Sequence, residues 1–155
     1  MFVIGDVHGR LDLLKPLYDE ISKYKEPIYS VGDLADRGPN GLECFKFVKE
    51  HNINCVRGNH EQFLIDYFTD KSNPRLWMRN GGFPTVDAIM DLPEEEIKSL
   101  VKWIKSWPLC IINHQEKYII YHAGPRRQFT LGMDVQNFMD KEITMKIFSG
   151  IDKDI

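Results

Sequence analysis

The sequence predicts an α/β fold built as one domain. Short apolar runs of strand type alternate with amphipathic helical segments, which is the order expected for stacked βα units. Three of these runs end in a glycine that is followed directly by an oxygen-bearing side chain, at Gly5-Asp6, Gly32-Asp33 and Gly58-Asn59. The 155 residues, 43% of them hydrophobic, suffice for one ordinary core and are too few for two domains.

Each of the first three units pairs a strand with a helix. The strands are expected over residues 1–4, 28–31 and 53–57, and each helix follows with apolar side chains at helical spacing. These apolar positions are Leu13, Leu14, Leu17, Tyr18 and Ile21; Leu42, Phe45 and Val48; and Phe63, Leu64, Tyr67 and Phe68. The glycines at the strand ends are expected to let the backbone turn without a Cβ clash, so that the following side chains point into one cleft.

The pattern changes in the rest of the chain. Residues 80–84 interrupt the helical spacing, and a further helix is expected over 92–104, where three successive glutamates near the start suit the helix dipole. The strand-like runs 109–113 and 118–121 flank a polar stretch and predict a β-hairpin. A last helix is expected over 133–150, where it would cover an open sheet edge.

Histidines lie beside the same strand ends. His8 lies two residues beyond Asp6, and His60 directly follows Asn59. His122 ends the last strand-like run. Because the carboxyl ends of neighbouring parallel strands share one edge of a sheet, these side chains should meet there. Carboxylate, imidazole and amide ligands suit hard to borderline divalent metals, so the sequence predicts a metal site without sulfur.

Composition argues against several other classes of site and partner. A net charge of −3 gives no basic field for nucleic acid or an anionic membrane. Cys44, Cys55 and Cys110 are odd in number and far apart, which argues against disulfides and cysteine metal sites. We interpret His51 and His114 as turn residues. No apolar stretch has membrane-spanning length, and a strand from residue 1 leaves no room for a secretory signal, so we expect a cytoplasmic protein.

Four strings together carry a family resemblance. They are Gly5-Asp6-Val7-His8-Gly9, Gly32-Asp33-Leu34-Ala35-Asp36-Arg37-Gly38, Gly58-Asn59-His60-Glu61 and His122-Ala123-Gly124. In this order and spacing they closely resemble the phosphoprotein phosphatase branch of the calcineurin-like metallophosphoesterases, including its small phage and bacterial members. The resemblance implies a four-layer α/β/β/α sandwich that is shortened at its C-terminus. Residues 1–155 would form one domain, with the motifs within 5–124 and a divergent or incomplete part over 125–155.

The resemblance also implies two divalent metal ions at the strand ends, with manganese as the first expectation and iron or zinc as alternatives. Carried over by motif, Asp6 and His8 hold the first ion and Asp33 bridges both. Asn59 and His122 hold the second. A carboxylate can bridge two cations about 3.5–4 Å apart. We therefore expect substitution of Asp33 to be the most damaging single change.

Three further residues receive the phosphate chemistry from the same resemblance. Arg37 would bind the phosphate oxygens, which suits its bidentate donor fork. His60 would be the general acid that protonates the leaving oxygen, and Asp36 would orient its imidazole. The implied reaction is direct in-line hydrolysis of a phosphomonoester by a hydroxide held between the metals. The implied substrate is phosphoserine, phosphothreonine or phosphotyrosine in a protein, or a small phosphoester.

The end of the chain departs from the family pattern and keeps other functions open. Family members have a further metal-binding histidine and a phosphate-binding arginine downstream, whereas no histidine follows His122 here. Arg126-Arg127 could replace the arginine, although such a pair after a Gly-Pro turn is more often solvated. The chain would then be a fragment, a compact enzyme, or a catalytically impaired module that binds metal or phosphate. Hydrolysis of a dinucleoside polyphosphate is the alternative enzymatic activity on the same motifs.

Overall fold

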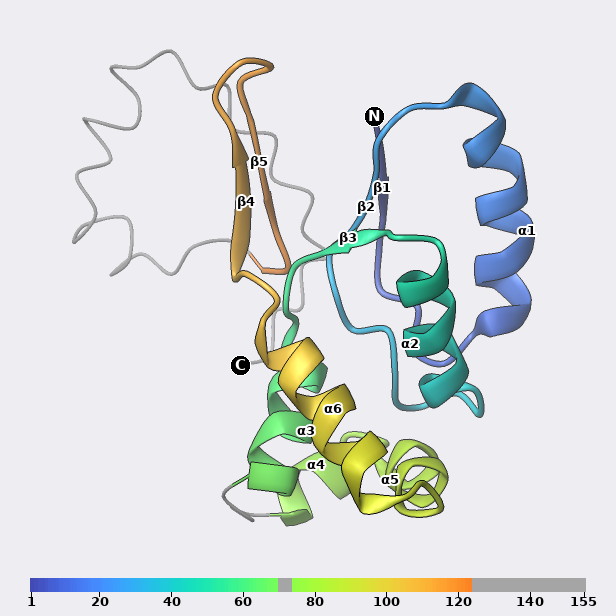
Figure 1. The fold of residues 1–155 in the computed structure, drawn as a ribbon, viewed down its shortest axis with the longest axis vertical. Helices are drawn as coiled ribbons and strands as arrows, with labels where there is room; N and C mark the ends of the chain where they lie inside the picture. The colour runs from blue at the N-terminus through green and yellow to red at the C-terminus, as the bar shows by residue number, and fades with distance from the viewer. Residues whose placement is uncertain (70–73, 124–155) are drawn as a thin grey trace, which may run out of the picture.

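The centre of the fold is a small parallel sheet. In a computed structural model that describes residues 1–69 and 74–123, β1 (Phe2–Ile4), β2 (Ile28–Ser30) and β3 (Asn54–Cys55) pair in parallel in the order β1-β2-β3 (Figure 1). The strands lie within the expected ranges and are shorter than those ranges. The Arg126-Arg127 pair and the helix expected over 133–150 lie outside the described residues.

Two helices cover one side of this sheet. α1 (Leu11–Ile21) and α2 (Gly41–Glu50) each follow a strand, and a short 3₁₀ helix, η1 (Ser22–Tyr24), extends α1. Their buried side chains include Leu14, Phe45 and Val48, which belong to the main core. Because Leu14 and Phe45 stand at helical spacing from other apolar residues, the periodicity already indicated this buried face.

A hairpin covers the other side of the parallel sheet. β4 (Cys110–Asn113) pairs antiparallel with β5 (Tyr118–Tyr121), as the sequence predicts. Val31, Val56, Tyr118 and Ile120 form a second buried cluster, and Figure 1 shows the hairpin on the side away from α1 and α2. The hydroxyls of Tyr29 and Tyr118 lie 2.9 Å apart across this contact. The described residues thus supply the first three layers of the α/β/β/α order.

Four helices gather below the carboxyl ends of the parallel strands in Figure 1. They are α3 (Asn59–Thr69), α4 (Pro74–Arg79), α5 (Phe83–Met90) and α6 (Glu94–Lys105). Residues 80–82 of the break expected over 80–84 form the turn between α4 and α5, whereas residues 83 and 84 are the first of α5. The apolar spacing did not predict either helix. None of the helices in the described residues is long and apolar enough to cross a membrane.

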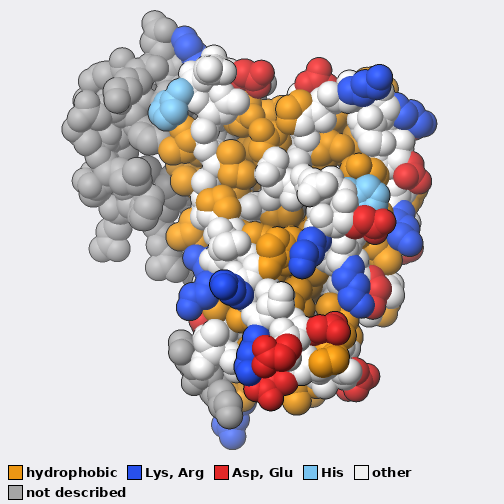
Figure 2. Space-filling model, in the orientation of Figure 1, with side chains coloured by type: hydrophobic (Ala, Val, Ile, Leu, Met, Phe, Trp, Pro, Cys, Tyr) orange, Lys and Arg blue, Asp and Glu red, His pale blue; other side chains and the backbone are white. Residues whose placement is uncertain are grey.

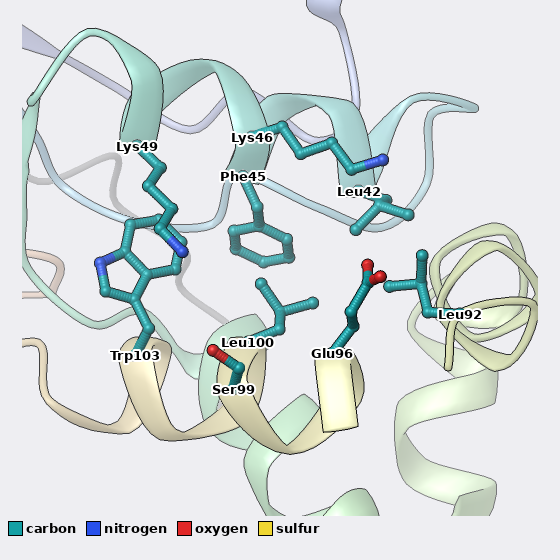
Figure 3. A pocket seen from close by; sticks show the side chains of 9 residues that line it. All are labelled: Leu42, Phe45, Lys46, Lys49, Leu92, Glu96, Ser99, Leu100 and Trp103. Carbon is teal, nitrogen blue, oxygen red and sulfur yellow. The ribbon is translucent and has the colours of Figure 1, made fainter. Parts of the chain in front are cut away.

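A shallow groove of about 170 Å³ lies between α2 and α6 (Figure 3). It is lined by Leu42, Phe45, Lys46, Lys49, Leu92, Glu96, Ser99, Leu100 and Trp103. The Lys49 ammonium lies 5.3 Å from the centroid of the Trp103 ring. Figure 2 shows acidic and basic side chains interspersed with apolar ones on the face of the molecule that it presents. None of the residues predicted to bind metal or phosphate lines the groove, so the groove is separate from the predicted site.

Candidate active site

The predicted metal ligands meet at the carboxyl ends of the strands. Asp33 is the centre of the group, with its side chain almost fully buried. Its Oδ2 lies 3.9 Å from His8 Nε2 and 3.5 Å from His122 Nε2. Asp6 lies on the open side of the group, 3.9 Å from a ring nitrogen of each of these two histidines. One carboxylate therefore faces ligands that come from both sheets.

Backbone carbonyls orient both histidine rings. The Nδ1–H of His8 donates to the carbonyl oxygen of Ala35 at 3.1 Å, and the Nδ1–H of His122 donates to that of Val31 at 2.9 Å. A carbonyl partner at Nδ1 leaves the Nε2 lone pair of a neutral imidazole available for a metal. In both residues this Nε2 is the atom that points toward Asp33.

The chemistry of the donor atoms fits a cation. His122 Nε2 lies 2.9 Å from Asn59 Oδ1. With the Nδ1 proton on the Val31 carbonyl, both of these atoms are acceptors, and two acceptors this close need a shared positive charge. Ligands at about 2.1 Å from one cation and at right angles to each other lie about 3 Å apart. Two groups in the described residues have ligand atoms within 4.8 Å of one another, namely His8, Asp33 and His60, and Asp6, Asp33 and His122.

The backbone around Asp33 has an unusual conformation. Asp33, Asp36 and Arg37 all have positive φ, at 50°, 70° and 64°. Left-handed backbone costs a non-glycine residue about 1–2 kcal/mol, so the surrounding contacts must hold this loop in place. Gly58 is one of these contacts, because a Cβ there would collide with Asp33 Oδ1. A Cβ at Gly5 would meet nothing within 4 Å, so the expected steric need for glycine is wrong at that junction.

Glu61 joins the second and third strand ends. Its Oε2 accepts hydrogen bonds from the backbone N–H of Asp33 at 2.8 Å and of Gly58 at 2.9 Å, and its Oε1 accepts one from Leu34 at 2.9 Å. Burial and the charge of Asp33 raise the pKa of the Glu61 carboxyl to about 7, while the three N–H donors favour its ionised form. The motif contains Glu61, but the sequence alone did not indicate this structural role.

His60 and Asp36 form a buried pair beside Asp33. His60 Nδ1 lies 2.6 Å from Asp36 Oδ2, and its backbone N–H donates to Asp33 Oδ1 at 3.1 Å. Burial alone would lower the pKa of His60, but the hydrogen bond to Asp36 and the charges of Asp33 and Asp36 together raise it. The pair thus holds the imidazole by its Nδ1 and leaves Nε2 facing Asp33 and Arg37.

Arg37 lies at the mouth of this buried pair. Its side chain is exposed, and Nη2 lies 3.3 Å from His60 Nε2. The guanidinium has only donors, so in this contact His60 Nε2 is the acceptor, and Nε2 can carry a transferable proton once Arg37 turns to another acceptor such as a phosphate. All eight residues that the motifs predict thus lie in one region. Glu61 is an addition that the structure reveals, and so are Trp77 and Thr85, which hydrogen-bond to Asp36.

Known proteins are similar to this chain in sequence. A family model described as calcineurin-like phosphoesterase matches residues 1–153. The chain is 39% identical over 127 residues to "Serine/threonine-protein phosphatase 1" of Salmonella typhimurium, covering 79% of this chain and 58% of that protein. It is 33% identical over 127 residues to "Bis(5'-nucleosyl)-tetraphosphatase, symmetrical" of Pasteurella multocida, covering 79% of this chain and 43% of that protein.

A solved structure shares the fold. The metallophosphoesterase from Sphaerobacter thermophilus aligns with a TM-score of 0.56 and 29% identity, covering 81% of this chain and 46% of that chain. The chain thus spans about half the length of the proteins it matches. The match over residues 1–153 and the identity to curated relatives show that the chain belongs to the calcineurin-like phosphoesterase family.

Proposed function

We propose that the chain is a metal-dependent phosphomonoesterase that uses two divalent ions. The observation that supports this best is the placement of His60 Nε2, which lies 3.3 Å from Arg37 Nη2 and 3.9 Å from Asp33 Oδ2. Arg37, which would bind phosphate, thus lies close to His60, which would donate a proton, and to Asp33, which would bind metal. In-line phosphoryl transfer to water needs these three functions together.

The residues that would hold the ions are those that the motif resemblance indicates. Asp6 and His8 would hold the first ion, Asn59 and His122 the second, and Asp33 both. Bound divalent cations would supply a nucleophile at neutral pH and would neutralise charge on the phosphate. Asp33 suits the bridging role because its Oδ2 approaches histidines of both groups, at 3.9 and 3.5 Å.

Three other side chains would act on the phosphoester itself. The exposed guanidinium of Arg37 would bind two phosphate oxygens and orient the ester for in-line attack. His60, protonated through its bond to Asp36, would give the Nε2 proton to the leaving oxygen as the P–O bond breaks. Asp36 would remain a carboxylate and stabilise the imidazolium before transfer. His60 would then regain a proton from solvent.

For the substrate we propose phosphoserine and phosphothreonine in proteins, with phosphotyrosine or a small phosphoester as further options. The relative named "Serine/threonine-protein phosphatase 1" supports this choice, since it shares 39% identity with the chain. The motifs also resemble small phage and bacterial phosphatases of this type. A dinucleoside polyphosphate is the second candidate, supported by the relative named "Bis(5'-nucleosyl)-tetraphosphatase, symmetrical" at 33% identity.

A substrate panel tests the proposal. The full chain is loaded with manganese, iron or zinc and offered a phosphoserine peptide, p-nitrophenyl phosphate and diadenosine tetraphosphate. Release of inorganic phosphate from the peptide, fastest with manganese, is the expected result. Exclusive formation of nucleoside diphosphate from the dinucleotide would overturn the protein substrate and favour the second candidate. One bound metal and no product from any substrate at any pH would overturn the enzyme proposal in favour of a binding module.

A further inference from the structure

The segment 77–85 holds the loop that carries Asp36 and Arg37. It runs from the buried Trp77 of α4 through the Gly81-Gly82 turn into α5. The Trp77 indole N–H donates to Asp36 Oδ2 at 2.6 Å, and the Asp36 backbone N–H donates to Thr85 Oγ1 at 2.9 Å. The Arg37 backbone N–H donates to the Gly81 carbonyl at 2.9 Å. These contacts support a loop whose Asp36 and Arg37 both have positive φ.

Two neighbours hold the Trp77 ring in place. Its side chain is 2% exposed, and its ring lies edge-on to Tyr67 with centroids 5.2 Å apart. Gly82 also lies so close that a Cβ there would come within 2.7 Å of the indole Nε1. An indole held in this way keeps its single donor aimed at one acceptor.

Both strong donors to Asp36 converge on the same oxygen. Oδ2 accepts from His60 Nδ1–H and from Trp77 Nε1–H, each at 2.6 Å. The other oxygen, Oδ1, is buried and has no hydrogen-bond partner in the described part of the chain. Two donors at one oxygen fix the plane of the carboxylate, whereas one donor would leave it free to rotate and carry the imidazole with it. An unsatisfied buried oxygen such as Asp36 Oδ1 destabilises the fold by about 1–3 kcal/mol. The carboxylate therefore needs the second hydrogen bond at Oδ2, from Trp77, to keep this orientation.

We propose that Trp77 is a positioning residue that aims His60 Nε2 at the leaving-group oxygen by fixing the Asp36 carboxylate. The inference rests on the proposed phosphomonoesterase function. Trp77 does not touch the phosphoester, and its indole N–H is a hydrogen-bond donor that does not act as an acid or base at neutral pH. Its contribution is therefore to the direction of proton donation, and it should matter only where the leaving group needs a proton.

The test compares two leaving groups. The leaving group of phenyl phosphate is a strongly basic phenoxide, which needs a proton as the P–O bond breaks. The leaving group of 2,4-dinitrophenyl phosphate is a weakly basic phenoxide, which leaves without one. Trp77→Phe, which keeps an aromatic ring and loses the N–H, should lower kcat about tenfold for phenyl phosphate and less than about twofold for the dinitrophenyl ester. KM and bound manganese should stay unchanged. Equal losses for the two esters, or no loss for either, would overturn the proposal.

Trp107→Phe is the matched control. Trp107 is also buried, at 7% exposure, and its ring packs on Phe45 and Trp103 away from the site. This variant should leave the ratio of the two rates unchanged. Replacement of Trp77 by benzothienylalanine, in which sulfur takes the place of the N–H at nearly equal volume, should cause the same selective loss with phenyl phosphate. This variant replaces Trp77→Phe in the test if the phenylalanine variant does not fold.

A measurement without turnover separates this inference from the proposed function. In the metal-free protein, a proton in the 2.6 Å His60–Asp36 bond should give a far-downfield NMR signal. That signal should shift or broaden in both Trp77 variants and stay in place in Trp107→Phe. If wild-type protein hydrolyses neither ester, the proposed function fails and this signal alone decides the role of Trp77. An unchanged signal in both Trp77 variants would overturn the positioning role.

Discussion

The two halves of the candidate site differ in how the protein holds them. In the buried half, the side chains of His60 and Asp36 are each 1% exposed, and neighbouring residues provide their hydrogen bonds. In the open half, Asp6 is 45% exposed, and His8 and His122 are 16% and 14% exposed. The carboxylates of Asp6 and Asp33 come within ion-pair distance only of histidines in the described residues.

This difference indicates that only one half is complete without a ligand. The buried pair is already assembled by Trp77, Thr85 and the His60–Asp36 bond. In the open half, carboxylates and acceptor atoms face one another, which is stable only with an added cation or a protonated imidazole. Variants should therefore separate into those that lose metal and those that lose proton transfer with the metal retained.

Asp33→Asn should have the largest effect. The amide can accept the His60 N–H but cannot supply the bridging negative charge, so metal content should fall toward zero. We expect kcat/KM to fall on the order of 10⁴-fold. Metal analysis and assays with p-nitrophenyl phosphate measure both quantities. The exposed Asp87→Asn is the control, and an Asp33→Asn protein with full metal content would contradict the bridging role.

His60→Asn should affect the other half alone. Removal of a general acid lowers the rate about 10²–10³-fold, here on phenyl phosphate. Metal content should equal that of wild type, because His60 is held by Asp36 rather than needed as a ligand. Equal loss of metal in His60→Asn and Asp33→Asn would erase the distinction between the halves and would make His60 a ligand of the His8 and Asp33 group.

The arrangement of the strands could be predicted from local pattern. Strand runs, helix faces and the hairpin depend on periodicities of two and about 3.6, which are visible within a few residues. The helices α4 and α5 could not be predicted in this way. They have 6 and 8 residues and are separated by Gly81 and Gly82, so neither shows enough apolar repeats to stand out.

Prediction of the site depended on the type of residue. Side chains that can bind metal or transfer protons, such as Asp33 and His60, indicate their possible role by residue type, and their positions at strand ends predict that they lie together. Trp77 and Thr85 could not be predicted as site residues, because they lie 41 and 49 positions from Asp36 and their contacts exist only in the folded chain. An indole in an apolar segment is usually a core residue, and nothing in the sequence shows which carboxylate its N–H reaches.

A pair of glycine variants compares the backbone at a buried strand end with the backbone at an open one. Gly58 and Gly5 each precede a candidate ligand directly. An added methyl at Gly58 meets the Asp33 side chain and backbone and Glu61 Oε2, whereas one at Gly5 meets nothing within 4 Å. We expect Gly58→Ala to lower the free energy of unfolding by about 2 kcal/mol. Gly5→Ala should change it by less than about 0.5 kcal/mol. Urea denaturation measures both, and equal effects would show that the two junctions are equally constrained.

The smallest expected effect concerns the pH dependence of the buried half. Burial lowers the pKa of His60, and Asp36 and Asp33 more than offset it, so the net shift is upward. A raised histidine pKa means that the imidazolium stabilises the metal-free fold below about pH 6.5, and this contribution is lost as the pH rises through the folded value. Asp36→Asn should lower the pKa of His60 and flatten this part of the stability curve. NMR titration of the His60 ring and urea denaturation between pH 5 and about pH 9 measure both, with Asp87→Asn as control. A His60 that titrates at an equal or higher pH in Asp36→Asn would show that Asp33, and not Asp36, holds its proton. His60 would then belong with Asp33 in the metal-binding half of the site.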